Sequence, residues 1–197
     1  MRRRDLVRAA AFLLLAPIPV LADHISEQLH ATGKAETKLA GLSITRSGVN
    51  VSEATRLFGE PTEKKVAPNN PVWVGYRWQL GRATLEVGTA NGRITDVYVA
   101  GTAEGTASRT GAGLKLGDGL DRLKALYGPK FDDRVYPDMH EIMHRSDRVP
   151  YSGIWERRRV TIQWASPEYT LTAGIDERGR IVSLWLLRPE CFPGERE

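Results

Sequence analysis

Apolar and polar residues alternate along several stretches in the middle and the C-terminal half of the chain. Such alternation occurs in the ranges 73–80, 82–87, 93–99, 153–157, 160–165, 169–175 and 180–187. A period of two places every second side chain on the same face of a β-strand. The pattern predicts antiparallel strands with one face on a core and the other toward solvent. The polar range 63–71 between two such stretches is expected to be a loop.

A different period marks the range 117–129, where apolar residues recur at i, i+3, i+6 and i+7. These residues are Leu120, Leu123, Leu126 and Tyr127. The spacing predicts a short amphipathic helix with one buried face. Asp118 is expected to cap its start, and Gly128-Pro129 is expected to end it.

The range 48–61 repeats this arrangement, with Val51, Ala54, Leu57 and Phe58 at the apolar positions and Gly59 at the end. Each predicted helix precedes strand-like stretches and a Gly-Arg-Ile sequence, at 92–94 and at 179–181. The repetition predicts an α+β fold of two tandem helix-plus-antiparallel-sheet units, with separate sheets or one continuous sheet. The expected divisions are a leader (1–22), a polar lead-in (23–41), unit 1 (42–100), a linker (101–113), unit 2 (114–187, insertion 130–150) and a tail (188–197).

The first 22 residues have the composition of an export signal. Arginines precede an apolar run, and Val20-Leu21-Ala22 supplies the residues of a cleavage site. The run is too short and too rich in proline to span a membrane. Arg3-Arg4 and the residues after them resemble a twin-arginine signal, and an ordinary secretory signal explains them equally well. We therefore expect a periplasmic or secreted protein that is cleaved near Ala22.

Removal of this leader changes the charge of the chain. The whole sequence has a formal charge of +4, and the leader holds four arginines and one aspartate, a net +3. The mature chain is then close to +1, which does not favour nucleic-acid binding. The only cysteine, Cys191, has no partner in the chain for a disulfide bond.

The helix, its Gly-Pro stop and the Gly-Arg-Ile hairpin resemble the small unit of the SmpA/OmlA outer-membrane-assembly lipoproteins. Two such units in one exported chain resemble the arrangement of the β-lactamase-inhibitory proteins. The resemblance rests on Gly48, Gly59-Pro61 and 92–94, and on Gly117, Gly128-Pro129 and 179–181. It implies protein partners without naming one, because these are motifs of fold. The chain lacks both a lipid-bearing cysteine and the inhibitors' disulfides.

His140, Glu141 and His144 form a literal H-E-x-x-H. On a helix, the two histidines would share one face and bind zinc, and Glu141 would activate a water molecule. Glu156 and Glu168 are candidate third ligands. The alternative function is thus a zinc-dependent hydrolase.

The surroundings of this motif favour a surface loop instead. Charged residues flank the histidines, and Pro137 and Pro150 confine any helix to a few residues. No second carboxylate is placed by the sequence to orient either imidazole. We therefore expect no catalytic residues, no metal and no cofactor.

Aromatic residues occupy the polar positions of several predicted strands. Tyr98 lies between two valines, and Trp185 lies between two leucines, so both point away from the core. Trp73, Arg77 and Arg159 fall on the same outer face. Aromatic and arginine side chains are enriched in protein-binding hot spots. Alternatively, the N-terminal segment or the insertion 130–150 covers these rings within the monomer.

The sequence thus favours an exported, non-enzymatic module that binds another protein of the envelope or exterior, in the manner of an inhibitor. The predicted binding residues are Trp73, Arg77, Tyr98, Arg159 and Trp185. The alternatives are the zinc hydrolase and a purely structural envelope protein. We expect no nucleic-acid partner and no membrane span.

Overall fold

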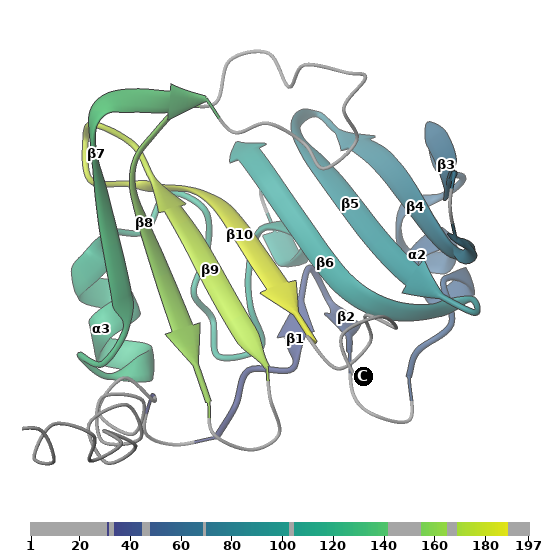
Figure 1. Ribbon diagram of the computed structural model, residues 1–197, viewed down its shortest axis with the longest axis horizontal. Helices are drawn as coiled ribbons and strands as arrows, with labels where there is room; N and C mark the ends of the chain where they lie inside the picture. The colour runs from purple at the N-terminus through teal and green to yellow at the C-terminus, as the bar shows by residue number, and fades with distance from the viewer. Residues whose placement is uncertain are drawn as a thin grey trace, which may run out of the picture.

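An antiparallel sheet of eight strands, in the order β3-β4-β5-β6-β10-β9-β8-β7, dominates the structure (Figure 1). The structure is a computed structural model that describes residue 31 and the ranges 34–44, 48–68, 70–102, 105–141, 155–164 and 169–188. The strands are β3 (Glu63–Ala67), β4 (Asn70–Leu80), β5 (Arg82–Ala90), β6 (Arg93–Thr102), β7 (Asp132–Glu141), β8 (Trp155–Gln163), β9 (Thr170–Ile175) and β10 (Ile181–Leu187).

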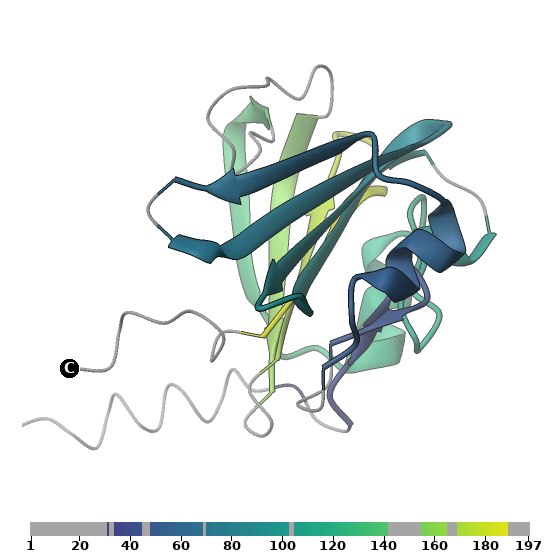
Figure 2. The same cartoon turned by 90° about the vertical axis from the view of Figure 1, so that its right-hand side faces the viewer.

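Two α-helices and a small hairpin cover one face of this sheet (Figure 2). The helices are α2 (Ser52–Phe58) and α3 (Leu120–Tyr127), and β1 (Lys38–Leu39) pairs with β2 (Leu42–Ser43). A 3-10 helix, η1 (Gly105–Ser108), follows β6. Among the described residues, no helix is long and apolar enough to cross a membrane.

The predicted α+β class with two helix-plus-sheet units is wrong. The chain is mostly β, and it does not form two helix-plus-sheet units. Of the two sheet arrangements left open, the single continuous sheet is present, because β6 pairs directly with β10. This pairing aligns Tyr98 with Trp185 and Val99 with Leu184. Core residues from both halves of the chain consequently form one cluster. The two α-helices are only 7 and 8 residues long.

Three strands differ from the sequence expectation. The range expected to be a loop contains β3, which pairs with β4 at one edge of the sheet. Part of the insertion forms β7, which pairs with β8 at the other edge. The ranges 153–157 and 160–165 were expected to be separate strands, whereas Trp155–Gln163 is one continuous strand.

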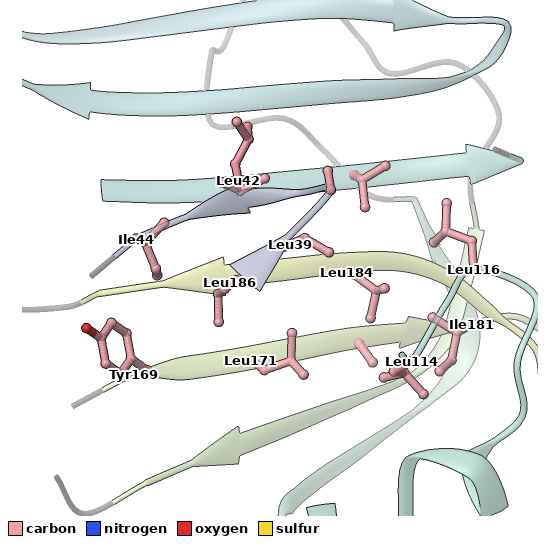
Figure 3. Close-up of a cluster of buried hydrophobic side chains, with 14 of the residues drawn as sticks. Leu39, Leu42, Ile44, Leu114, Leu116, Tyr169, Leu171, Ile181, Leu184 and Leu186 are labelled. Atoms are coloured by element: carbon pink, nitrogen blue, oxygen red, sulfur yellow. The ribbon is translucent and has the colours of Figure 1, made fainter. Parts of the chain in front are cut away.

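The core lies between the sheet and the elements on its covered face. Val97, Val99, Leu184 and Leu186 are fully buried, which confirms the faces predicted from alternation. Figure 3 shows Leu39, Leu42 and Ile44 of the hairpin segment beside leucines of β9 and β10. The segment expected to be a polar lead-in thus contributes buried residues, including Leu39 and Ala40.

Both helices end at a glycine, as predicted. Gly59 and Gly128 have φ of 79° and 84°, and their N–H groups donate to Thr55 and Lys124. This conformation favours glycine because it has no Cβ. The predicted cap by Asp118 is wrong, because Gly119 is the N-cap and the Asp118 carboxylate accepts from the Lys115 N–H at 3.0 Å.

Helix α3 packs on the sheet through Leu123 and Tyr127, which are 0% and 4% exposed. Leu123→Ala is expected to lower the free energy of unfolding by at least about 2 kcal/mol, because it removes buried methyl groups and leaves a cavity. Urea denaturation measures this change. A loss below roughly 0.5 kcal/mol would show that α3 does not pack as described.

The Glu36 carboxylate joins three separate segments in a cluster that we call the clasp, formed by Glu36, Thr110 and Tyr127. Glu36 accepts hydrogen bonds from the N–H groups of Thr37, Lys38 and Ala112 and from the Tyr127 hydroxyl, all at 2.9–3.0 Å. Thr110 Oγ1 lies 2.7 Å from the same hydroxyl. Burial raises the pKa of Tyr127 well above its usual range, so the hydroxyl stays protonated. The clasp ties the N-terminal segment to α3 and to the segment before it.

Candidate functional site

The face of the sheet opposite the helices carries a hollow of about 410 Å³, which we call the central hollow. Its lining comes from β3, β4, β5, β6, β8, β9 and β10. No described helix lies over this face (Figure 2). The hollow is therefore a depression in the sheet itself, on the side that faces away from the core.

All five predicted binding residues line the central hollow: Trp73, Arg77, Tyr98, Arg159 and Trp185. They come from four strands and are brought together by strand pairing. Tyr98 and Trp185 are direct partners across β6 and β10, at the centre of the sheet. Both side chains are half-buried, whereas their neighbours in sequence are fully buried. The alternation thus predicted that these residues lie on the face of the sheet away from the core, which the structure confirms, whereas their binding role remains a prediction.

Arg77 is held by two glutamates across adjacent strands. Its Nη1 lies 2.8 Å from Glu63 of β3, and its Nε donates to Glu86 of β5 at 2.6 Å. Lys65 also pairs with Glu63, at 2.8 Å. The register explains the arrangement, because Arg77 is opposite both Glu63 and Glu86. The guanidinium is fixed in place, and its charge is compensated within the protein.

Arg159 is held in a similar way at the other side of the central hollow. Its Nε and Nη2 donate to one oxygen of Glu156 at 2.9 and 2.7 Å. The other oxygen accepts from the Ser183 hydroxyl at 2.9 Å. Glu156 is only 2% exposed, so this carboxylate is buried and fully engaged. The arginine also lies 5.9 Å from the centre of the Tyr136 ring, within the range of a cation–π contact.

Glycines make room for the carboxylates that lie on this face. A Cβ at Gly174 would collide with the Glu156 carboxylate and the Ser183 hydroxyl. A Cβ at Gly88 would collide with the Asp96 carboxylate. Gly75 is opposite Gly88 in the register, and a Cβ there would meet only a backbone oxygen of Lys65 at 4.0 Å. Gly75 is therefore the one of these three that opens into the hollow.

Gly174→Ala is expected to lower the free energy of unfolding by about 1–3 kcal/mol, because the new methyl group displaces the Glu156 carboxylate from Ser183. Gly75→Ala is the matched control and is expected to change it by no more than about 0.5 kcal/mol. Thermal or urea unfolding of both variants makes the comparison. Equal stabilities would show that Glu156 does not occupy the space over Gly174.

The H-E-x-x-H motif does not begin on a helix. His140 and Glu141 lie in β7, where they are opposite Glu156 and Trp155. Neither the surface loop that was expected nor the helix of the alternative is present at these two residues, because both lie in a strand. His144 and Glu168 lie outside the described residues. Within the described part, no three His, Cys, Asp or Glu residues are grouped as a metal site.

Comparison with known proteins identifies no family. No family model and no curated protein matches the chain. Solved structures with weak likeness include a cysteine-rich secretory protein from Staphylococcus aureus (12% identity, TM-score 0.44). The match covers 80% of this chain and 51% of that one, so this chain spans about half of that protein.

Two further structures are similarly distant. A DUF4309 family protein from Bacillus subtilis has 18% identity and a TM-score of 0.39, over 75% of this chain and 82% of that one. A candidate β-lactamase inhibitor protein from Streptococcus mutans has 13% identity and a TM-score of 0.27, over 85% and 96%. The resemblance to SmpA/OmlA units remains a prediction. The structure itself defines a mostly β protein with a covered face and a hollowed one.

Proposed function

We propose that this chain is a non-enzymatic binding protein that holds another protein against the hollowed face of its sheet. One observation carries the proposal: the aromatic and arginine residues selected from sequence surround a single hollow on that face. Such side chains supply most of the binding energy at protein interfaces, especially around a central pocket. The partner would be a protein of the cell envelope or the exterior.

The rigidity of the hollow supports this role. Its residues lie on paired strands, and both arginines are fixed by carboxylates. A site that is already ordered loses little conformational entropy when a partner binds. An inhibitor-like module benefits most from such rigidity. The finer proposal is therefore that the partner is an enzyme whose surface is blocked, in line with the resemblance to β-lactamase-inhibitory proteins.

Export is part of the proposal, and it rests on the sequence of 1–22. Expression in a bacterial host with intact export is expected to give a mature chain that begins at Asp23, which N-terminal sequencing or intact mass measures. A chain recovered with its leader intact, from the cytoplasm only, would contradict it.

Photo-crosslinking from the hollow tests the binding role. A photoreactive phenylalanine derivative replaces Trp73 in one variant and Trp155 in another. Each variant is expressed in the organism from which the protein comes, so that its natural partner is present. Trp155 is 44% exposed and does not line the hollow, so it is a matched aromatic control. We expect one protein adduct from position 73 that is absent from position 155.

A substitution at Gly75, added to the crosslinking variant, tests whether the adduct depends on the hollow. Gly75→Trp fills the open space over Gly75 and is expected to abolish the adduct, whereas Gly75→Ala is expected to keep it. Adducts that are the same from both crosslinking positions, or that persist in Gly75→Trp, would overturn the proposal. A purified β-lactamase assayed with and without the protein tests the inhibitor-like form separately.

A further inference from the structure

The charges around the central hollow nearly cancel. Its lining includes four carboxylates, Glu63, Glu86, Asp96 and Glu156, and three cations, Lys65, Arg77 and Arg159. Each cation lies within 2.9 Å of a carboxylate oxygen. An incoming charged side chain would therefore have to displace one of these ion pairs or lose its water without a full counter-charge. Both are costly in a partly enclosed site.

The lining of the hollow is open at Gly75, which has no side chain. A Cβ at Gly75 on β4 would meet only a backbone oxygen of Lys65 at 4.0 Å, whereas the Asp96 carboxylate occupies the space over its partner Gly88. Trp73, Tyr98 and Trp185 also line the hollow. The hollow, of about 410 Å³, has room for several water molecules. Release of this water from aromatic and backbone surfaces favours an apolar occupant.

Each of the two arginines has N–H groups that can donate hydrogen bonds to main-chain carbonyl groups of the occupant. In the described part of the chain, Arg77 uses Nε and Nη1, and Arg159 uses Nε and Nη2. One terminal amino group of each guanidinium remains as a donor. A neutral carbonyl oxygen suits such a donor, because the arginine charge is already balanced by glutamate.

We infer that the central hollow receives a single large uncharged side chain, aromatic or aliphatic, from a loop of the protein partner. The carbonyl groups of that loop accept hydrogen bonds from Arg77 and Arg159. This inference rests on the proposed binding function and adds the chemistry of recognition. It distinguishes this site from one that selects an arginine, a lysine or an acidic side chain.

The test uses four capped amino acids as probes and the indole N–H signals of the protein as reporters. N-acetyl-phenylalaninamide and N-acetyl-leucinamide are compared with N-acetyl-argininamide and N-acetyl-glutamic acid amide. We expect the uncharged probes to shift the Trp73 and Trp185 signals with dissociation constants on the order of 1 mM. The buried Trp78 and Trp164 are internal controls, and their signals should not move.

Variants link the shifts to the hollow. Gly75→Trp should weaken binding of N-acetyl-phenylalaninamide by about tenfold or more, and Gly75→Ala should change it by no more than about threefold. Charged probes that bind as tightly as the uncharged ones, or no shift with any probe, would overturn the inference. Neither result depends on the crosslinking experiment, so a specific adduct without amide binding would leave the proposed function standing and reject only this recognition chemistry.

Discussion

Trp78→Ala is expected to lower the free energy of unfolding by about 3–5 kcal/mol. Trp78 is 1% exposed, on the covered face of β4, and its ring packs against Phe58 and Tyr76 with centroids 6.4 and 6.2 Å away. Its Nε1 donates to the Gly59 carbonyl at 2.8 Å, which fastens the end of α2 to the sheet. The substitution leaves both a large cavity and a carbonyl without this donor. Urea denaturation monitored by circular dichroism measures the loss.

Trp185→Ala is the matched control for this prediction, because it removes the same side chain from the opposite face. Trp185 is half-buried and lines the central hollow. We expect its removal to cost at most about half as much, since less apolar area leaves water on folding. Equal losses for the two variants would mean that Trp185 serves the fold, and the interface proposal would then lose its central residue.

The sequence predicted the faces of the strands well, because alternation is a local property. Val97 and Val99 are buried and Tyr98 is not, and the same holds for Trp185 and its leucine neighbours. The helical spacing also identified Leu123 and Tyr127 as buried. It failed at Leu57, which is 42% exposed. Helix α2 is only seven residues long, so few of its positions can face the sheet.

The fold class was wrong because it depends on contacts between distant residues. No local pattern shows that β6 pairs with β10, so the sequence left separate sheets and one continuous sheet open, and this pairing makes the single sheet. The edge strands were missed for a related reason. β3 contains Glu63, Lys64 and Lys65, and β7 contains Pro137, which are the charged and proline residues that natural edge strands carry. Such residues are typical of loops when read without the partner strand.

The candidate site was predicted in part. Parity and residue type identified the aromatic and arginine residues but not the carboxylates that hold the arginines. Glu156 was considered only as a zinc ligand, whereas it binds Arg159 and Ser183. A usable signal was present in Gly88 and Gly174, because a glycine inside a strand often marks a close approach of another group. The identity of that group depends on register, which the sequence does not display.

The clasp at Glu36 was also absent from the sequence analysis, since Glu36 lies in a polar segment without periodicity. The structure places it at 6% exposure, where four donors from three segments converge on one carboxylate. Partners 76 and 91 residues away, Ala112 and Tyr127, make these contacts long-range. The clasp therefore fixes the N-terminal segment, whose Leu39 and Leu42 complete the core.

Glu36→Ala is expected to lower the free energy of unfolding by about 2 kcal/mol or more, because it removes the acceptor of three part-buried backbone N–H groups and of the buried Tyr127 hydroxyl. Hydrogen bonds to a charged group contribute about 1.5–3 kcal/mol each where they are buried, and exposed N–H groups recover part of the loss from water. Glu53→Ala on α2 is the matched control, since that glutamate is solvent-exposed in its pairing with Arg56, and its unfolding midpoint should stay close to that of the wild type. Tyr127→Phe should fall between them, because it removes one of the four donors and keeps the ring in the core. Hydrogen exchange adds a local measurement. In Glu36→Ala the amides of Thr37, Lys38 and Ala112 should exchange faster than in the wild type, whereas the amides in the centre of the sheet should remain the most slowly exchanging ones. A Glu36→Ala variant as stable as Glu53→Ala would show that the N-terminal segment is held by its apolar residues alone.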